Sequence, residues 1–475
     1  MIITYVNYMG LSINSALGIL WPMNSLAQDL NRQLQGSIAE RLLSDLGKRM
    51  FFPKGIVAQS AEAAAHAKRF NATVGMALGS GQPLMLPSLQ HLVPGLTSRE
   101  AVAYAPTGGL PVLRGLWKDQ ILSKNPSIVS GEAISHPMVV PGLTAGIFQA
   151  AELFLNPGDV VLIPDMFWGN YRLVIEGRRQ AVIEEFPFFT AQGTFNQEAF
   201  SQALETAADK TDKITVMLNF PNNPSGYTPT RQEAAAIVQA LTAQADRGTD
   251  ILVITDDAYF GLFFEPECER ESIFAKLVTA HPRILAMKID GATKEDLVWG
   301  FRVGFVTFGS RDMTQPQYEA LLQKLMGSIR SSVSSSPGIS QHLLIKTLQA
   351  PDYQKEKLSF EQTMKERYLA VRQVLETPEA QDARQYLEPL PFNSGYFMSF
   401  RCQGFSSEDL RLALLDQGIG TISIAGTFLR IAFSSIDAQD IPELYNELFR
   451  TAARLGGTNT TQGSKTEQDE TKDRR

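Results

Sequence analysis

A lysine and an arginine stand eight residues apart, Lys294 and Arg302, in the stretch IDGATKEDLVWGFRVGF. A lysine amine can form an imine with an aldehyde, and a guanidinium binds a phosphate through two hydrogen bonds. The glycines on either side of FRV let the chain around Arg302 pass close to a ligand. A single lysine is ordinarily solvated, so this chemical interpretation depends on the polar groups that accompany it.

Two further polar groups follow apolar runs of the sequence. Asp256 and Tyr259 lie in DDAY after ILVIT, and the segment NFPNNPSG (219–226) follows KITVML. A buried carboxylate needs a partner, which a cationic ring nitrogen or a helix N-terminus can supply. The alternative is that these carboxylates are solvated at a strand end on the surface, and we prefer this interpretation for Asp257. Taken alone, NFPNNPSG is a rigid turn before a helix that Thr230 caps.

A third polar group opens a helix that is apolar almost all round. This helix begins in PGLTAGIFQAAELF (141–154), and its first turn holds Thr144 together with backbone N–H groups that have no partner within the helix. The positive end of the helix dipole and these amides suit a phosphate ester. For this segment by itself, a plain buried helix after a turn remains the favoured interpretation.

Apolar runs of five to eight residues alternate with longer helical patterns between residues 96 and 345, for which we expect one large domain. The runs are VVLIPD (160–165), KITVMLNF (213–220), ILVIT (251–255), RILAMKI (283–289) and RVGFVTF (302–308). This alternation predicts an α/β fold with a mainly parallel sheet sandwiched by helices. Ligands bind beyond the carboxyl ends of such strands, and Asn219, Asp256 and Lys294 each follow one of them.

Residues 346–455 are expected to form a smaller α+β domain. Helical segments rich in Glu, Lys and Gln lead there into two candidate strands, YFMSF (396–400) and LRIAF (429–433). Residues 23–95 are expected to contribute to this small domain. Within them, the stretch from 37 to 50 has the spacing of one amphipathic helix, whose apolar face carries Ile38, Leu42, Leu43 and Leu46.

Both ends of the chain are expected to lie outside the core. The first 28 residues carry no charge, but they lack the basic segment of a signal peptide and their apolar run is interrupted. We interpret residues 1–22 as an extension, with Met23 as the true start. Residues 456–475 contain no large apolar side chain, so we expect a disordered tail.

The composition excludes several classes of protein. A net charge of -7 argues against a nucleic-acid partner, and neither GxGxxG nor GxxxxGK followed by serine or threonine occurs. The histidines form no HxxxH or HxH pair, so we expect no metal. Cys268 and Cys402 have no paired spacing, which favours a reducing compartment, and we expect a cytoplasmic protein without a membrane partner.

Together the segments resemble those of class I/II aminotransferases, which are pyridoxal-5'-phosphate (PLP) enzymes of fold type I. The resemblance covers about residues 51–435 and is carried by motif order and spacing. Lys294 matches the family's Schiff-base lysine, which follows serine or threonine and precedes an arginine by eight positions. Arg302 matches that arginine, which binds the cofactor phosphate. In DDAY, Asp256 matches the aspartate on the pyridine nitrogen and Tyr259 the tyrosine on the ring hydroxyl.

The resemblance also implies roles for other residues around the cofactor. Asn223, in NNPSG, matches an asparagine that bonds the ring hydroxyl. Trp168, in FWGNY, matches the aromatic residue that stacks on the ring, with core packing as its alternative role. Leu143 and Thr144 fall where the family binds phosphate at a helix start. The family often has a serine three residues before the lysine, where this chain has Gly291.

Three residues are implied to act on the substrate or across subunits. Tyr104, in YAPTGG, resembles the tyrosine that reaches the phosphate of the neighbouring subunit, which implies a homodimer with shared sites. Arg430, in LRIAF, resembles the arginine that pairs with the substrate α-carboxylate, with an edge-strand arginine as the alternative. Arg330, in IRSSVSSSP, resembles the arginine that holds a distal carboxylate across the dimer, and a surface arginine is an equal alternative.

The resemblance therefore implies a PLP-dependent aminotransferase that moves an amino group between an L-amino acid and a 2-oxo acid. It leaves open whether the donor is dicarboxylic (aspartate or glutamate) or aromatic. A PLP-dependent lyase or decarboxylase is one alternative, because the same residues serve those outcomes. A non-catalytic PLP-binding sensor is the other, although the short N-terminal segment and the acidic charge balance lead us to expect no added DNA-binding domain.

Overall fold

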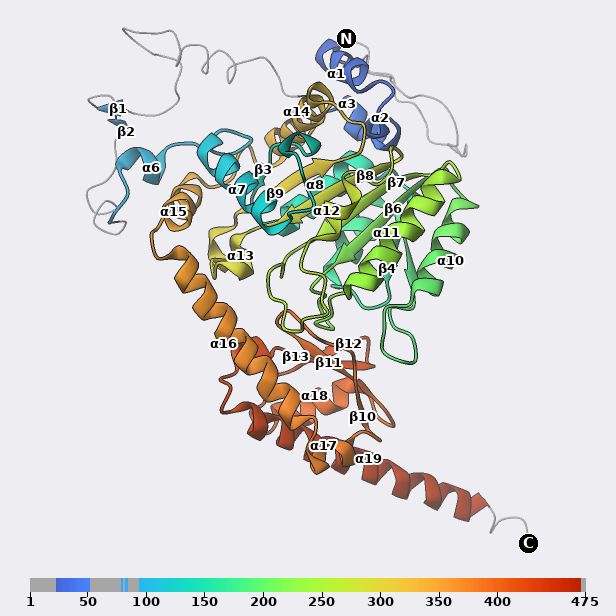
Figure 1. Ribbon diagram of the computed structural model, residues 1–475. Coiled ribbons are helices and arrows are strands. Elements are labelled where there is room, and N and C mark those ends of the chain that lie inside the picture. The colour runs from blue at the N-terminus through green and yellow to red at the C-terminus, as the bar shows by residue number, and fades with distance from the viewer. Residues whose placement is uncertain (1–22, 52–77, 80–81, 84–93, 471–475) are drawn as a thin grey trace, which may run out of the picture.

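The computed structural model describes residues 23–51, 78–79, 82–83 and 94–470. The described chain forms a large domain around a central sheet and a smaller domain around a second sheet. Helix α16 (Tyr353–Val374) runs from one to the other (Figure 1). Residues 1–22, predicted to be an extension, lie outside the described residues.

The central sheet confirms the predicted α/β class. Within the described residues its strands lie in the order β3-β9-β8-β7-β6-β4-β5, and only β9 runs antiparallel to its neighbours. Their bounds are β3 (Met138–Val140), β4 (Val160–Pro164), β5 (Val182–Phe186), β6 (Lys213–Asn219), β7 (Asp250–Asp256), β8 (Ile284–Asp290) and β9 (Gly304–Gly309). Two strands were not predicted from the sequence: β3, which is short, and β5, an edge strand in which two adjacent glutamates interrupt the apolar run.

Helices cover both faces of this sheet. One face carries α8 (Leu143–Phe154), α14 (Gln315–Ser332) and the N-terminal helices α1 (Ser25–Leu34), α2 (Ile38–Leu42) and α3 (Asp45–Arg49). The other carries α7 (Pro111–Lys124), α10 (Gln197–Ala208), α11 (Arg231–Asp246), α12 (Ile273–Leu277) and α15 (Gly338–Leu348). Side chains alternate between the two faces along each strand, so neighbouring residues of one strand enter different cores.

Short elements complete the large domain. They are the two-residue strands β1 (Leu78–Gly79) and β2 (Gln82–Pro83), the helices α6 (Ser98–Val102), α9 (Asn170–Arg172) and α13 (Ala292–Glu295), a π-helical turn (Leu173–Arg178) and the 3-10 turns Gly131–Ala133 and Trp299–Phe301. Of these, α13 follows β8 directly and carries Lys294.

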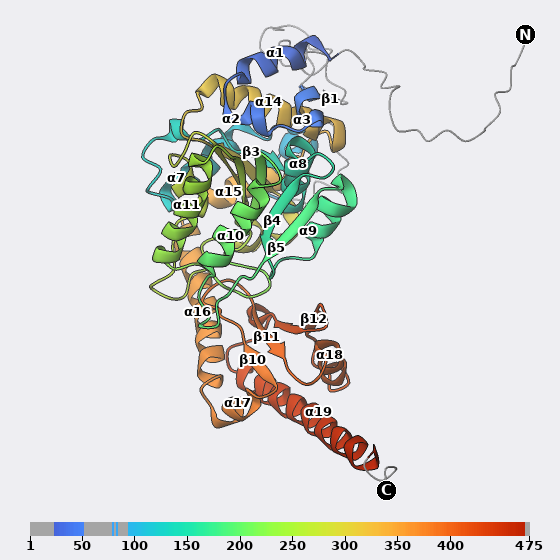
Figure 2. The same cartoon turned by 90° about the vertical axis from the view of Figure 1, so that its right-hand side faces the viewer.

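The small domain lies below the large domain in Figure 2. Within the described chain it contains an antiparallel sheet of order β10-β11-β13-β12. Its elements are β10 (Leu387–Pro389), β11 (Met398–Cys402), β12 (Ile422–Ile424), β13 (Phe428–Ile431), α17 (Pro378–Ala383), α18 (Ser407–Leu415), α19 (Ile441–Glu470) and the 3-10 turn Phe433–Ser435. The two strands expected from the sequence correspond to β11 and β13.

The N-terminal segment differs from its prediction in two ways. Residues 23–51 pack on the large domain, where α1 contacts α14 and α3 contacts α8, and not on the small domain. The ammonium of Lys324 holds them there through the carbonyls of Gly47, Lys48 and Met50. The single predicted helix is also broken after Leu42, because Ser44 donates its N–H to Leu153 and caps α3 through the N–H of Gly47.

Helix α19 continues to Glu470 (Figure 1), whereas residues 456–475 were expected to form a disordered tail. The first turns of α19 are anchored by buried Ile441, Tyr445 and Leu448. Once a helix has nucleated, each added residue gains a backbone hydrogen bond without a new nucleation cost, so a polar sequence can extend it. No helix among the described residues has the length and apolar character that crossing a membrane requires.

Candidate active site

The carboxyl ends of β6, β7 and β8 meet at a cavity of about 130 Å³ on the face covered by α8. Its walls combine polar strand ends with the start of α8: Leu143, Thr144, Ile147, Trp168, Asn219, Asn223, Asp256, Ala258, Tyr259 and Lys294. Seven of the residues selected from the sequence therefore line one cavity. They are Leu143, Thr144, Trp168, Asn223, Asp256, Tyr259 and Lys294.

Asp256 ends β7 and is almost fully buried. The phenol of Tyr171 donates to its Oδ2 over 2.5 Å, and the N–H of Ala258 donates to Oδ1 over 3.2 Å. Burial raises the pKa of Asp256 to about 6, while the bond from Tyr171 and the charge of Lys294 act in the opposite direction. The carboxylate is thus a ready partner for a cation that enters the cavity.

Lys294 lies on the single turn of α13, and its Nζ stands 5.0 Å from the centre of the Tyr259 ring. Burial lowers the pKa of Lys294, Arg302 adds to this effect, and Asp256 opposes it. A lowered pKa increases the fraction of neutral amine, which is the nucleophilic form. Burial also raises the pKa of Tyr259, so its phenol stays protonated at neutral pH.

Arg302 does not line the cavity itself but lies at the start of α8. A Cβ on Gly142, the N-cap residue, would stand 2.4 Å from a terminal nitrogen of Arg302, so only glycine leaves room for the guanidinium. Gly142 has a φ of +89°, which glycine tolerates at no steric cost. The first amides of α8 and this guanidinium together form an anion-binding corner.

Gly291 replaces the serine that the family often has before its lysine, and the packing explains it. A Cβ at this position would stand 2.8 Å from the carbonyl oxygen of Val303 and 3.0 Å from Gly304 Cα. Backbone atoms cannot give way as a side-chain end can, so β8 and β9 approach each other here only with glycine.

Arg430 approaches the site from β13 of the small domain. It donates over 2.8 Å to Oδ1 of Asn223, and its guanidinium lies 4.3 Å from the centre of the Phe397 ring. Its Nε is buried without a hydrogen-bond partner among the described residues, and burial lowers the pKa of the group. These features leave a guanidinium edge available to a carboxylate.

A groove of about 570 Å³ adjoins the cavity, and Trp168 and Asn223 line both. Arg430 lines this groove together with β12 residues of the small domain. A molecule in the groove can therefore touch Arg430 at one end and reach the cavity that holds Lys294 at the other.

Tyr104 and Arg330 are not brought to this cavity. The side chain of Tyr104 is 80% exposed. Arg330, near the end of α14, is exposed and donates over 2.5 Å to the hydroxyl of Ser334. Both residues were expected to act in the site of a neighbouring subunit and not in their own.

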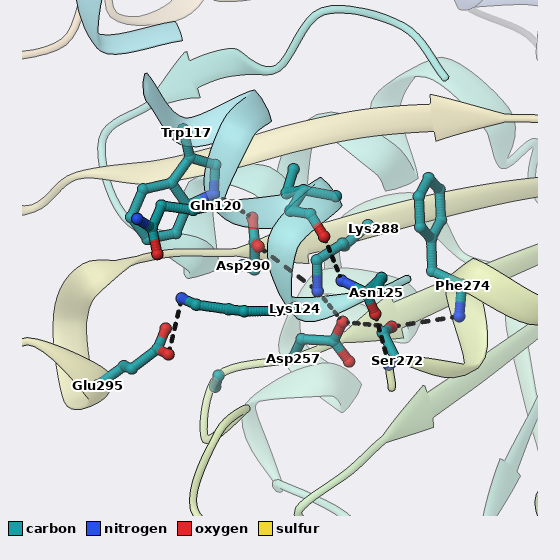
Figure 3. Close-up of polar contacts among 12 residues, drawn as sticks. Trp117, Gln120, Lys124, Asn125, Asp257, Ser272, Phe274, Lys288, Asp290 and Glu295 are labelled. Atoms are coloured by element: carbon teal, nitrogen blue, oxygen red, sulfur yellow. Dashed lines mark hydrogen bonds and ion pairs between the residues drawn. The ribbon is translucent and has the colours of Figure 1, made fainter. Parts of the chain in front are cut away.

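The preference for a surface position of Asp257 was wrong. Asp257 is buried on the opposite face of the sheet from Asp256, where it pairs with the buried Lys288 and accepts from Ser272 over 2.6 Å (Figure 3). Asp290 joins this cluster through Lys288 at 3.4 Å and Trp117 at 3.0 Å. Helix α7 covers this face. It therefore encloses the strand end that the sequence suggested would be solvated.

Sequence reasoning missed several residues of the site. Tyr171, Ile147 and Ala258 were not selected, although each lies within three residues of one that was. Tyr171 follows Trp168 by three positions in the same FWGNY motif, and the two rings meet edge to face with 5.6 Å between their centres, so proximity in sequence was a usable signal. Tyr396 was also missed. It donates over 3.0 Å to the carbonyl of Lys294 from a distant part of the chain.

The arrangement meets the needs of a phosphorylated ring with an aldehyde. The corner at α8 suits the phosphate, the buried carboxylate of Asp256 suits a protonated ring nitrogen, and the amine of Lys294 lies on the same cavity. The residues present therefore fit a bound group of this type.

Comparisons with known proteins indicate one family. The family described as aminotransferase class I and II matches residues 73–448. An aspartate aminotransferase from Bacillus sp. (strain YM-2) is 24% identical, over 59% of this chain and 66% of its own length. An aspartate/prephenate aminotransferase from Thermus thermophilus is 24% identical, over 57% of this chain and 62% of its own length. The chain thus spans less than two thirds of the length of these two relatives.

Solved structures show the same fold. A structure of an aminotransferase from Anaerococcus prevotii has a TM-score of 0.67 at 22% identity, and the match covers 94% of this chain and 100% of that one. The multiple substrate aminotransferase from Thermococcus profundus has a TM-score of 0.62 at 15% identity, covering 91% and 95%. Since the family match extends over most of the sequence, the chain belongs to the aminotransferase class I and II family.

Proposed function

We propose that this protein is a PLP-dependent aminotransferase that moves an amino group between an L-amino acid and a 2-oxo acid. One observation carries the proposal: Lys294 and Asp256 line the same cavity, and the anion-binding corner of Arg302 and Gly142 lies at the helix start that forms its wall. The family match and the names of the relatives support the same activity.

Each residue has a defined task in this proposal. When bound, PLP supplies an electron-accepting ring that makes the α-proton of an amino acid removable. Asp256 holds the proton on the ring nitrogen, and Tyr171 and Ala258 hold Asp256 in place. Lys294 would hold the cofactor covalently, and its amine, when free, would move the proton from the substrate α-carbon to the cofactor carbon that the lysine had occupied.

Substrate orientation falls to Arg430. Its guanidinium binds the α-carboxylate of the amino acid in the groove, with Asn223 and the Phe397 ring fixing its plane. Trp168 closes the cavity from the α9 side as the stacking surface for the cofactor ring. Fixing the carboxylate also fixes which bond at the α-carbon stands perpendicular to that ring.

We further propose a cytoplasmic homodimer with shared active sites. The exposure of Tyr104 supports a role toward the phosphate of a second copy, since its own cavity lies elsewhere. Arg330, also exposed, is proposed to hold the distal carboxylate of a dicarboxylic donor in the neighbouring site. If Arg330→Lys lowers the use of aspartate and glutamate but spares phenylalanine, that assignment holds, and an equal loss for all donors refutes it.

The test of the proposed function uses the purified protein with PLP. We expect an absorbance band from the covalent link to Lys294, and amino transfer to 2-oxoglutarate or pyruvate from one or more of the twenty L-amino acids. Lys294→Ala removes both signals. Lys276→Ala, which changes a lysine of α12 that pairs with Glu269, retains them. Product formation without any oxo-acid acceptor would instead indicate a lyase or decarboxylase.

A further inference from the structure

Helix α13 is a single turn, Ala292–Glu295, and it presents two adjacent residues to different surroundings. Lys294 lines the cavity, while Glu295 is buried away from it with a side chain that is 8% exposed. Because a helix this short has few internal hydrogen bonds, its position depends on contacts with other elements.

The carboxylate of Glu295 is held by two lysines from distant elements. Lys124 of α7 stands 2.8 Å from Oε1, as Figure 3 shows, and Lys357 of α16 stands 2.5 Å from the same atom. Burial would raise the pKa of Glu295, but Lys124 and Lys357 outweigh it and lower the pKa to about 2. Glu295 is therefore ionised at neutral pH and stays bound to both cations.

Further contacts fasten the same turn to α16 and to the small domain. The phenol of Tyr353, at the start of α16, donates over 2.6 Å to Asp296, and Lys357 stands 3.8 Å from that carboxylate. On the other side, Tyr396, which precedes β11, donates over 3.0 Å to the carbonyl of Lys294. Three side chains from beyond the large domain thus contact α13 and the residue that follows it.

Helix α16 is the connection through which the small domain can act. Its first turns carry Tyr353 and Lys357 beside α13, and its last turns pack against α19 in the small domain (Figure 1). The small domain also carries Arg430, the proposed carboxylate-binding residue. A change in the angle of α16 therefore affects both ends of the substrate site.

We propose that Glu295 is a positioning residue that couples the orientation of the small domain to the placement of Lys294, with Lys357 of α16 as the moving partner and Lys124 of α7 as the fixed one. This inference rests on the proposed function, since it assigns Lys294 the covalent and proton-transfer role. Glu295 itself lines neither the cavity nor the groove.

The test compares Lys357→Met, Glu295→Gln and their double variant with a matched control. The control is Lys276→Met on α12. It removes the lysine that stands 2.8 Å from the carboxylate of Glu269, whose side chain is also 8% exposed. Lys357→Arg keeps the charge and tests rescue. Glu295→Gln keeps the side-chain volume and carries the same test should Lys357→Met fail to fold.

Two readouts separate positioning from a general structural role. The first is the single-turnover rate with a saturating amino acid, which should fall about 10- to 100-fold in both single variants, as for a small displacement of a catalytic group. The concentration giving half-saturation should change less than about threefold, because Arg430 and Asn223 are untouched. The double variant should lose no more than either single one, because both changes remove the same ion pair.

The second readout is the pH midpoint of the absorbance band of the Lys294–PLP link without substrate. Loss of Lys357 leaves a negative charge beside Lys294 and should raise this midpoint, whereas Glu295→Gln should lower it. The inference is supported if both variants lose rate and their pH midpoints shift in opposite directions. Lys357→Arg should then restore the rate, and Lys276→Met should leave it unaffected.

Other outcomes overturn it. A rate within about twofold of wild type in Lys357→Met or Glu295→Gln excludes coupling through this pair, because a twofold change corresponds to only about 0.4 kcal/mol. An equal rate loss in Lys276→Met excludes it as well. If the unaltered protein shows the absorbance band and transfers amino groups, failure concerns this inference alone. If it shows neither, the proposed function fails first, and this inference fails with it.

Discussion

The phenol of Tyr171 donates a 2.5 Å hydrogen bond to Oδ2 of Asp256, which lines the cavity, and both side chains are buried. Burial raises the pKa of Asp256 to about 6, and the bond from Tyr171 opposes this rise. The charge of the carboxylate that faces the cavity thus depends on a tyrosine from α9, a helix that lies between β4 and β5 in the chain.

Removing that phenol should move the pH dependence of cofactor binding. In Tyr171→Phe the pKa of Asp256 rises further, so we expect the pH below which the apoprotein loses PLP affinity to move up by about one unit. Affinity at pH 8.5 should change little. Fluorescence titration with PLP across pH measures this. Tyr445→Phe is the control, because Tyr445 is buried but its hydroxyl has no partner among the described residues.

Asp256→Asn should stabilise the apoprotein while weakening cofactor binding. The folded-state pKa of about 6 lies above the ordinary 3.8, so the folded state keeps its proton longer and stability falls as pH rises through that window. Asparagine does not ionise, so Asp256→Asn removes this loss of stability at higher pH. We expect a gain of about 1–3 kcal/mol in the free energy of unfolding at pH 7 and none at pH 3.5. Urea unfolding measures it, and an equal stability at pH 7 would contradict the assignment.

Gly142→Ala should weaken PLP binding through Arg302. The new Cβ would displace a guanidinium nitrogen that now leaves it only 2.4 Å, so we expect about a 10- to 100-fold loss of affinity from one disturbed charged contact. Backbone strain alone is controlled by Gly158→Ala, since Gly158 has a φ of +84° with open space where the Cβ would stand. Similar losses of affinity in both variants would show that strain, and not Arg302, is responsible.

Arg430→Lys should separate carboxylate recognition from catalysis. Lysine keeps the charge but loses the planar two-pronged contact, so we expect the half-saturation concentration for the amino acid to rise about 10- to 100-fold. The affinity for PLP should stay within about threefold, since Arg430 lies toward the groove and not in the cavity wall. Arg401→Lys, on neighbouring β11, is the control. An unchanged half-saturation concentration in Arg430→Lys would refute the role.

The strands that carry the site were predictable because their signals are local. Apolar runs such as those of β6, β7 and β8 are typical of strands buried on both faces, and parallel strands bring their carboxyl ends to one edge. The polar residues just beyond those runs were therefore expected to meet, and Asn223, Asp256 and Lys294 line one cavity.

Contacts that depend on distant elements were not predictable in this way. Asp256 and Asp257 are adjacent, and alternation along the strand sends them to opposite faces of the sheet. Whether the second face is solvated depends on α7 and α12, which bring Trp117 and Ser272 to the cluster around Asp257. No sequence pattern near Asp257 predicts these contacts.

By itself, the sequence determined the fold class, the strands at the site and most of the residues around the cavity, because dihedral preference, apolar patterning and motif spacing are properties of short segments. The tertiary structure alone decided which side chains fasten them: Tyr171 on Asp256, Tyr396 on the carbonyl of Lys294, and Lys124 with Lys357 on Glu295. These contacts arise only when separate elements pack, since their energies depend on distance and burial that no single segment specifies.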